Sequence, residues 1–181
     1  MRDLVVTENM TLDGVIDGAG GWFGPAGDAD QDDVTDELDR QRERADAFLT
    51  GRVTFEEMRG YWPHVRHDIT GISAYLDQVD KYVVSSTLDD PQWQHTTVLR
   101  SLDEVEDLKA LPGGDIVATG SIALVHALLE AGLVDELRLF VHPRVMGSGR
   151  RLFDGAVLPR LDLAEARSFR SGITLLRYRT G

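Results

Sequence analysis

The sequence predicts a single α/β domain built on one central sheet. Apolar runs alternate with amphipathic segments from one end of the chain to the other, as strands alternate with helices in such domains. A chain of 181 residues is long enough for one sizeable core but short for two domains. Its composition, 42% hydrophobic and 28% charged, is that of an ordinary globular protein. We therefore expect one domain over residues 1–181.

The first elements follow from an apolar run and a glycine-rich stretch. Leu4 to Val6 is a buried type of run, which we expect to be the first and central strand. Residues 17–29 are rich in glycine and contain Pro25, so they are expected to form a loop. Trp22 in this loop is as consistent with a lid over a substrate as with packing against the sheet edge.

The next predicted element is a helix over 30–44. Acidic residues at its start and arginines at its end match the helix dipole, and Val34 and Leu38 give it an inner face. Further helices are predicted at 52–60, 70–78, 102–110 and 121–132. Further strands are predicted at 46–50, 81–88, 96–100, 115–120, 134–145, 160–170 and 173–180, the last two antiparallel and joined at Ser171 and Gly172.

Charge and composition exclude several classes of function. A formal net charge of −12 argues against general nucleic-acid binding, which requires Lys and Arg to neutralise phosphates. The chain has no cysteine, so disulfides and thiolate chemistry are excluded. No apolar run approaches the roughly 20 residues of a membrane-spanning helix, so a cytoplasmic protein without membrane contact is the default expectation. His64 and His67 have metal-like spacing, but without an obvious third ligand we expect no metal site.

Three of the predicted strands end in glycine or small polar residues. The segments are TGRVT at 50–54, SST at 85–87 and TGSIA at 119–123. In open α/β sheets ligands lie at the carboxyl ends of the strands, where helix N-termini present N–H groups to phosphate. Gly51 or Gly120 alone is consistent with a tight turn between strand and helix. Together with Arg52 and the serines they indicate a site for a phosphorylated cofactor.

Five segments follow one another in a characteristic order along the chain. They are MTLDGVI at 10–16, GRVTFEEM at 51–58, YVVSST at 82–87, the run from Ala118 to Phe153 and the terminal LLRYR. This order resembles the dihydrofolate reductase-like superfamily, most closely its RibD C-terminal family, over nearly the whole chain. The resemblance implies a dihydrofolate reductase-like fold, with a mixed, mostly parallel sheet, flanking helices and a C-terminal antiparallel hairpin.

The resemblance also implies NADPH as the cofactor and indicates where it would bind. Arg52 and Ser86 match the residues that hold the 2′-phosphate, which distinguishes NADPH from NADH. Val53 and Thr54 would hold the pyrophosphate through backbone N–H groups, and the turn at Gly120 would form a second phosphate-binding segment. The expected set, of which the first two border the nicotinamide, is Leu12, Ile16, Gly51, Arg52, Val53, Thr54, Ser85, Ser86, Thr87, Gly120, Ser121, Ile122, Ala123 and Leu124.

The substrate side departs from the pattern of dihydrofolate reductases. Those enzymes carry a carboxylate on the first helix that binds the pteridine ring, whereas the matching position here is Thr35. Val34 and Leu38 on the inner face of that helix, together with Trp22, are the residues that we expect at the substrate. Asp13 is a candidate for supplying a proton and, equally, for capping the loop at 12–16.

The resemblance implies an NADPH-dependent oxidoreductase that transfers hydride to a C=N or C=O carbon of a small heterocyclic substrate. Reduction of 5-amino-6-(5-phosphoribosylamino)uracil in riboflavin biosynthesis and reduction of dihydrofolate are the two nearest activities. The alternative is a non-catalytic nucleotide-binding or regulatory protein that keeps the reductase fold.

Two segments bear on partners. The predicted strand at 134–145 contains LRLFV and, with the pair at 160–180, would expose a sheet edge. Relatives commonly dimerise through this region, so we expect a homodimer unless a helix covers the edge. In MGSGRRLF at 146–153, Arg150 or Arg151 would contact an anionic substrate or a partner subunit, unless the segment is only a flexible turn.

Overall fold

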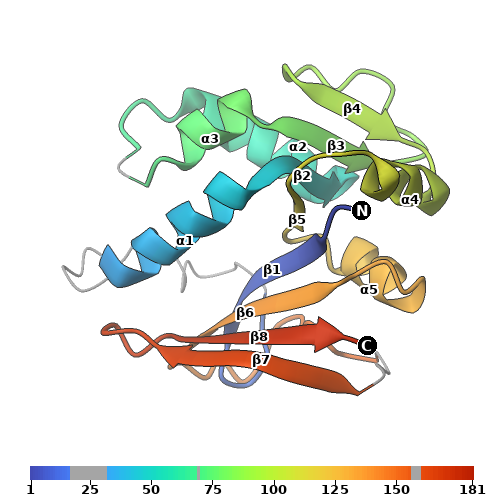
Figure 1. The fold of residues 1–181 in the computed structure, drawn as a ribbon. Coiled ribbons are helices and arrows are strands. Elements are labelled where there is room, and N and C mark those ends of the chain that lie inside the picture. Colours follow the sequence, from blue (N-terminus) through green and yellow to red (C-terminus); the bar gives the residue numbers. More distant parts are fainter. Residues whose placement is uncertain (17–31, 69, 156–159) are drawn as a thin grey trace.

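The computed structural model describes residues 1–16, 32–68, 70–155 and 160–181. In these ranges eight strands form one sheet, and helices flank it (Figure 1). The strands are β1 (Leu4–Thr11), β2 (Ala45–Gly51), β3 (Asp80–Val84), β4 (Thr96–Leu99), β5 (Asp115–Ala118), β6 (Glu136–His142), β7 (Leu161–Ser168) and β8 (Thr174–Thr180). The helices are α1 (Asp32–Arg44), α2 (Arg52–Tyr61), α3 (Ile72–Gln78), α4 (Leu102–Ala110) and α5 (Ile122–Glu130), with a 3₁₀ turn at Trp62–His64.

The sheet is mixed and mostly parallel, as the sequence predicts. Its strand order is β4-β3-β2-β5-β1-β6-β8-β7. Seven strands run in the same direction, and β8, which lies between β6 and β7, runs in the opposite direction. β1 is central, and it is longer than its apolar run because it pairs with β6 from Val5 to Thr11. The C-terminal antiparallel hairpin of β7 and β8 is confirmed.

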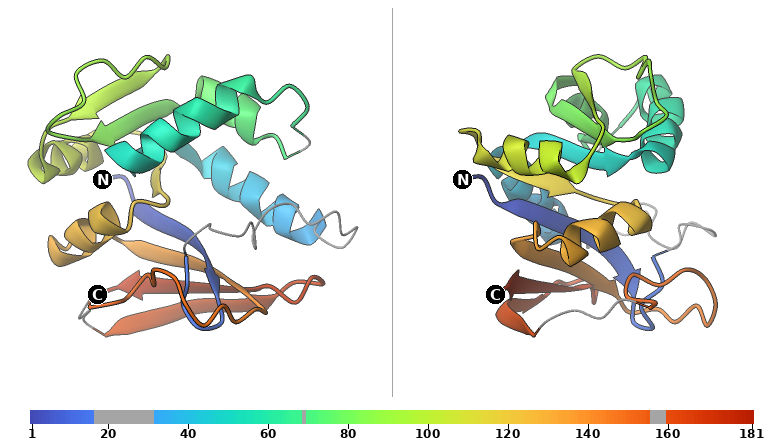
Figure 2. Two further views of the ribbon diagram at one scale, coloured as in Figure 1. Left: turned by 180° about the vertical axis from the view of Figure 1, so that it is seen from behind. Right: turned by 90° about the vertical axis from the view of Figure 1, so that its right-hand side faces the viewer.

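Helices cover both faces of the sheet (Figure 2). Successive residues of a strand point to opposite faces, so Leu49 packs in the cluster that includes residues of α4 and α5, whereas Phe48 packs with Leu76 of α3. Val34 of α1 packs on the same side as α3, against Phe140 of β6. Helix α1 therefore packs against the C-terminal strands of the sheet through this cluster.

Several predicted strands end earlier than their sequence pattern suggests, and for two of them a local hydrogen bond explains the end. β3 ends at Val84 because the Ser85 hydroxyl oxygen accepts a hydrogen bond from the Leu88 N–H, which closes a turn. β6 ends at His142 because the Arg144 N–H donates to the His142 carbonyl at 2.8 Å. In both places a local hydrogen bond replaces the next step of the strand ladder.

The strand that contains LRLFV is not a sheet edge, which corrects the expectation. β6 pairs with β1 on one side and with β8 on the other. The C-terminal edge of the sheet is formed by β7 instead, and its Leu163 is 57% exposed.

Candidate nucleotide-binding site

The carboxyl ends of β2, β3 and β5 border one cavity of about 930 Å³. The turns after β2 and β5 lead directly into α2 and α5, so both helices begin at this cavity. The structure brings together these expected residues at its lining: Ile16, Gly51, Arg52, Val53, Thr54, Ser85, Ser86, Thr87, Gly120, Ser121, Ile122, Ala123 and Leu124. Leu12 does not line the cavity, and its side chain is 68% exposed.

The turns at Gly51 and Gly120 pack closely against the side chains of Ser121 and Thr54. The Gly51 N–H donates to the Ser121 hydroxyl at 2.9 Å, and a Cβ at position 51 would lie 3.2 Å from the same oxygen. A Cβ at position 120 would lie 2.9 Å from Cγ2 of Thr54, closer than real Cβ contacts. Gly120 also has a φ of +61°, a left-handed conformation that favours glycine. Position 120 therefore requires glycine for two separate reasons.

Ser121, the residue before α5, also has a left-handed backbone, with a φ of 57°. Such a conformation is uncommon for a residue with a side chain, and it is typical of binding turns held by their surroundings. The Ser121 side chain makes no cap bond to α5, because its hydroxyl accepts the bond from Gly51 instead. The two turns thus form one unit at the start of two helices.

Arginine supplies positive charge at the cavity although the whole chain is acidic. Arg52, Arg100 and Arg150 all line it. Arg52 forms an ion pair of 2.8 Å with Glu56, one helical turn away, and it is 43% exposed, so this pair is a weak surface contact that a ligand can replace. Arg100 is oriented by a 3.0 Å hydrogen bond to the Ser85 carbonyl. Sequence reasoning missed Arg100, although its position directly after β4 carried the signal used for the other strands.

Asp13 caps its loop. The Thr11 hydroxyl donates to its carboxylate at 2.6 Å, and the N–H groups of Met146 and Gly147 donate at 3.2 and 2.8 Å. The Thr11 hydroxyl and the Gly147 N–H lower the pKa of Asp13 to about 2, so the group is ionised near neutral pH. These hydrogen bonds match the capping role that the sequence allowed for Asp13.

The segment at 146–153 ties this loop to the rest of the domain. Arg151 Nε donates to the Asp13 carbonyl at 3.0 Å, and Val15 and Arg151 form an isolated antiparallel bridge. The Ile16 N–H donates to the Arg150 carbonyl at 3.0 Å. The two arginines therefore help to hold the loop that carries Ile16 to the cavity, a role that the sequence did not indicate.

A buried carboxyl group lies beneath the second turn. Glu8 on β1 is 5% exposed, and burial raises the pKa of its carboxyl to about 8, although a hydrogen bond from the Gly120 backbone lowers it in part. Its Oε1 finds no hydrogen-bond partner among the residues that the structure describes. Glu8 is consequently protonated near neutral pH. Glu8 could not be recognised in the sequence, because it lies beyond the apolar run from Leu4 to Val6 that indicates the strand.

The structure does not place the expected substrate residues at the cavity. Val34 is buried in a core cluster with Phe140, and Leu38 packs against that cluster. The inner face of α1 also carries Glu37, whose carboxylate is bound by Arg167. Val34 is therefore part of the core and Leu38 packs against it, and neither of the two lines this cavity. Trp22 lies outside the described residues.

Two of the histidines have local partners. His126 Nε2 lies 2.5 Å from the Leu152 carbonyl, and His142 Nε2 lies 3.0 Å from Oδ1 of Asn9. Within the described ranges, no group of three or more His, Cys, Asp or Glu side chains is arranged to hold a metal ion. None of the helices described is long and apolar enough to cross a bilayer.

The chain is similar to known proteins over most of its length. A family model described as RibD C-terminal domain matches residues 2–175. The uncharacterized protein YyaP of Bacillus subtilis (strain 168) is 31% identical over 184 residues, which cover 98% of this chain and 94% of that protein.

Solved structures that share the fold include the following two. One is a diaminohydroxyphosphoribosylaminopyrimidine deaminase/5-amino-6-(5-phosphoribosylamino)uracil reductase from Thermotoga maritima, with a TM-score of 0.68, 16% identity and coverage of 99% of this chain and 57% of that one. The other is a dihydrofolate reductase from Enterococcus faecalis complexed with NADP(H) and RAB-propyl, with a TM-score of 0.64, 17% identity and coverage of 98% and 95%. These likenesses confirm a dihydrofolate reductase-like fold.

Proposed function

Because the chain belongs to the RibD C-terminal domain family, we propose that it is an NADPH-dependent oxidoreductase acting on a small heterocyclic substrate. The observation that carries the proposal is the cavity at the carboxyl ends of β2, β3 and β5, where two helices begin beside three arginines. Anions are stabilised at helix N-termini, and guanidinium groups bind phosphate through two parallel hydrogen bonds. This set of donors suits a dinucleotide with several phosphate groups.

The residues at the cavity fit such a cofactor. The first turns of α2 and α5 would bind the pyrophosphate, and glycine at position 120 leaves the backbone accessible where a Cβ would contact Thr54. Arg52 and Ser86 would hold the 2′-phosphate, with Arg100 as a second cation. NADPH would supply the hydride. The cavity volume of about 930 Å³ lies at the upper end of the range for cofactor sites.

The loop at 12–16 would orient the nicotinamide against the substrate. Ile16 lines the cavity, and the Asp13 carboxylate holds this loop to the N–H groups of Met146 and Gly147. A fixed loop contributes to the rate by orientation and exclusion of bulk water. Because Asp13 is ionised, we assign delivery of the proton to an ordered water.

We infer that the substrate is a pyrimidine- or pterin-like heterocycle with a C=N or C=O group. Dihydrofolate itself fits less well, because α1 carries Thr35 at the position of the pteridine-binding carboxylate, and Glu37 is bound by Arg167. A non-catalytic nucleotide-binding role is the second candidate. It is favoured by the ionised state of Asp13, since that side chain was the protein's candidate acid.

Cofactor choice tests the nucleotide site. Isothermal titration calorimetry should show tighter binding of NADPH than of NADH. The Arg52→Ala variant should lose about 1.5 kcal/mol of NADPH binding free energy, the lower end for a charge-assisted contact because Arg52 is 43% exposed. Arg160→Ala, which changes a side chain that is 93% exposed, is the control and should still bind NADPH more tightly than NADH. Equal affinity of the unmodified protein for the two cofactors would contradict the assignment.

Turnover distinguishes the two candidate functions. NADPH oxidation is followed by absorbance with pterins, ribosylaminopyrimidines and quinones as acceptors. Oxidation with a heterocycle identifies a reductase of that substrate class. Tight NADPH binding without oxidation by any of these acceptors would favour the non-catalytic candidate.

A further inference from the structure

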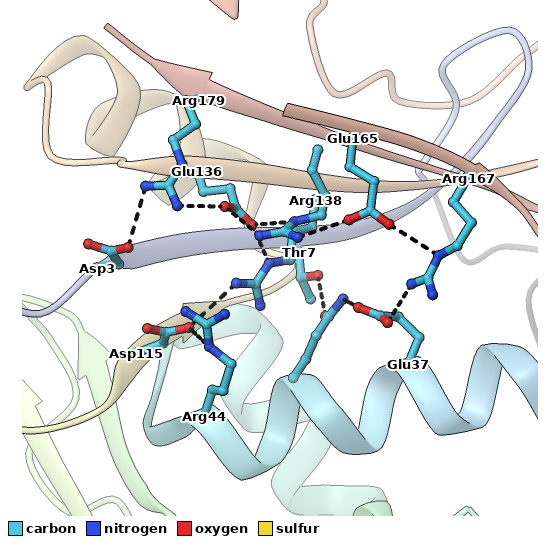
Figure 3. A network of polar contacts seen from close by, with 12 residues as sticks. Asp3, Thr7, Glu37, Arg44, Asp115, Glu136, Arg138, Glu165, Arg167 and Arg179 are labelled. Atoms are coloured by element: carbon cyan, nitrogen blue, oxygen red, sulfur yellow. Dashed lines mark hydrogen bonds and ion pairs between the residues drawn. The ribbon is translucent and has the colours of Figure 1, made fainter. Parts of the chain in front are cut away.

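A second cavity, of about 280 Å³, lies between α1 and the strands β6, β7 and β8, and different residues line it from those of the nucleotide cavity. Figure 3 shows the polar contacts around it. Two carboxylates, Glu37 and Glu165, line this cavity. Its remaining charged lining is positive, and the side chains are Arg40, Arg44, Arg138, Arg167 and Arg177.

The most buried of these arginines is Arg138 on β6. It is 2% exposed, and its Nε donates to Glu136 at 2.5 Å while Nη2 donates to Asp115 at 3.4 Å. The third nitrogen, Nη1, is buried and has no hydrogen-bond partner among the described residues. A buried donor without a partner costs free energy, and more so when it belongs to a charged group. The Arg138 guanidinium therefore leaves one strong donor unsatisfied at the cavity.

The carboxylates around the cavity are already engaged. Arg177 binds Glu136 through Nε at 2.9 Å and Glu165 through Nη1 at 2.9 Å. Glu37 is held by Arg167 and by Arg40. Burial alone would raise the pKa of Glu37, but the hydrogen bond from Arg167 holds it below its usual range, so the group is ionised.

Among the residues that the structure describes, the five lining arginines face four carboxylates, those of Glu37, Asp115, Glu136 and Glu165. At the margin of the network, Arg179 pairs with Asp3 at 3.6 Å and with Glu136 at 3.5 Å. Each arginine thus has a carboxylate nearby, but the guanidinium groups outnumber the carboxylates by one, which leaves one excess positive charge. A water molecule would satisfy the free N–H of Arg138 but not this charge, whereas an anion would satisfy both.

We propose that this cavity binds a small oxyanion, a carboxylate or a phosphate, between Arg138 Nη1 and the guanidinium of Arg167. Guanidinium groups present planar, paired donors that match the oxygens of both anions. The site is separate from the nucleotide cavity, and it does not depend on the proposed reductase activity.

The test is stabilisation of the unmodified protein by anions. Thermal unfolding midpoints are measured over a concentration series of sodium phosphate and of sodium acetate, each against sodium chloride at the same ionic strength. A saturable rise in midpoint gives an apparent dissociation constant for each anion. Saturation with phosphate but not acetate identifies a phosphate site, and the reverse identifies a carboxylate site.

Two variants locate the effect. Arg138→Lys keeps the charge beside Glu136 but removes Nη1, and Arg167→Gln removes a cation that is only 34% exposed. Each should weaken anion binding on the order of tenfold. If Arg138→Lys does not fold, Arg167→Gln decides alone. Arg160→Gln on the surface is the matched control and should leave the effect unchanged. Arg52→Gln is measured beside it and reports any anion that binds in the nucleotide cavity.

The proposal is overturned if neither anion raises the midpoint above that in chloride. It is also overturned if the anion effect is undiminished in Arg167→Gln, because the anion would then bind elsewhere. Loss of the effect in Arg52→Gln would identify the nucleotide cavity as that other site.

Discussion

The carboxyl group of Glu8 makes folding depend on pH in a way that can be calculated. Its pKa is raised to about 8 in the folded protein by burial, against an ordinary value of 4.5. Below pH 4.5 both the folded and the unfolded states are protonated. Between pH 4.5 and 8 the unfolded chain loses this proton while the folded protein keeps it, so stability is lost as the pH rises.

We expect Glu8→Gln to remove this loss, because glutamine is neutral throughout. From pH 5 to pH 7 the free energy of unfolding of the variant should gain about 2 kcal/mol relative to the unmodified protein. Urea unfolding of both proteins at pH 5, 6 and 7 measures the difference and cancels the contributions of other groups. A difference that stays constant across this range would show that Glu8 is ionised in the folded state.

Some of the functional side chains could be recognised from the sequence, whereas others could not. Arg52, Ser86 and Gly120 could be recognised because each lies within two residues of the end of a strand, where the chain must turn. Glu8 could not, since its properties come from β5 and the Gly120 turn, which are remote in sequence. The role of Asp13 was undecided for the same reason, because two of its three donors belong to the segment after β6.

Helix α3 depends on one buried lysine at its C-terminal end. Lys81 on β3 is fully buried, and its Nζ donates to the carbonyls of Leu76 and Val79 at 2.6 and 3.0 Å. The same ammonium group lies 5.0 Å from the centre of the Trp93 ring. Carbonyls at the end of a helix lack partners within it, so this lysine acts as a cap.

Replacing Lys81 by Met keeps the length of the side chain but leaves the two carbonyls without this donor. We expect the free energy of unfolding to fall by about 1–3 kcal/mol, as for a buried acceptor that loses its partner. Urea unfolding measures the change. Thr97→Ala, at an exposed position of β4, serves as the control, and its free energy of unfolding should stay within about 0.5 kcal/mol of that of the unmodified protein. No loss of stability in Lys81→Met would mean that burying the ammonium costs as much as its contacts contribute.

Helices and strands were recognisable from periodicity, but several of their ends were not. The helix predicted at 102–110 is confirmed as α4 with the same bounds, because Ser101 accepts a hydrogen bond from the Glu104 N–H and fixes its start. The strand predicted at 115–120 ends at Ala118, since Gly120 and Ser121 adopt left-handed backbones that leave the sheet. A sequence pattern shows which residues are apolar, whereas the end of a strand depends on the turn that follows.

For the whole molecule, the exposed edge strand β7 bears on assembly. An edge presents unpaired backbone groups, and Leu163 adds an apolar side chain that is 57% exposed. We propose that β7 takes part in a homodimer interface. Light scattering at micromolar concentration should give twice the mass of one chain, and Leu163→Arg should shift it towards the single chain. A mass of one chain for the unmodified protein would contradict the proposal.

The order of the sheet could be anticipated only in part. Parallel pairing of β1, β2, β3 and β5 follows from helices that connect consecutive strands. The position of β8 between β6 and β7 does not, because a terminal hairpin can join a sheet through either of its strands. The expectation therefore gave the exposed edge to the strand at 134–145 as well as to the pair at 160–180, whereas β6 is covered by β8 and the edge is β7.

The central place of β1 has a consequence for the order in which the chain acquires structure during synthesis. β1 leaves the ribosome first, yet Leu4 pairs with Ile116 and Val5 with Glu136, so both neighbours of this strand are made much later. Until then its apolar residues have no sheet to join, and contacts between such distant segments form slowly. The turn after β5 that lines the first cavity consequently cannot meet the Glu8 carboxyl until most of the protein has been translated.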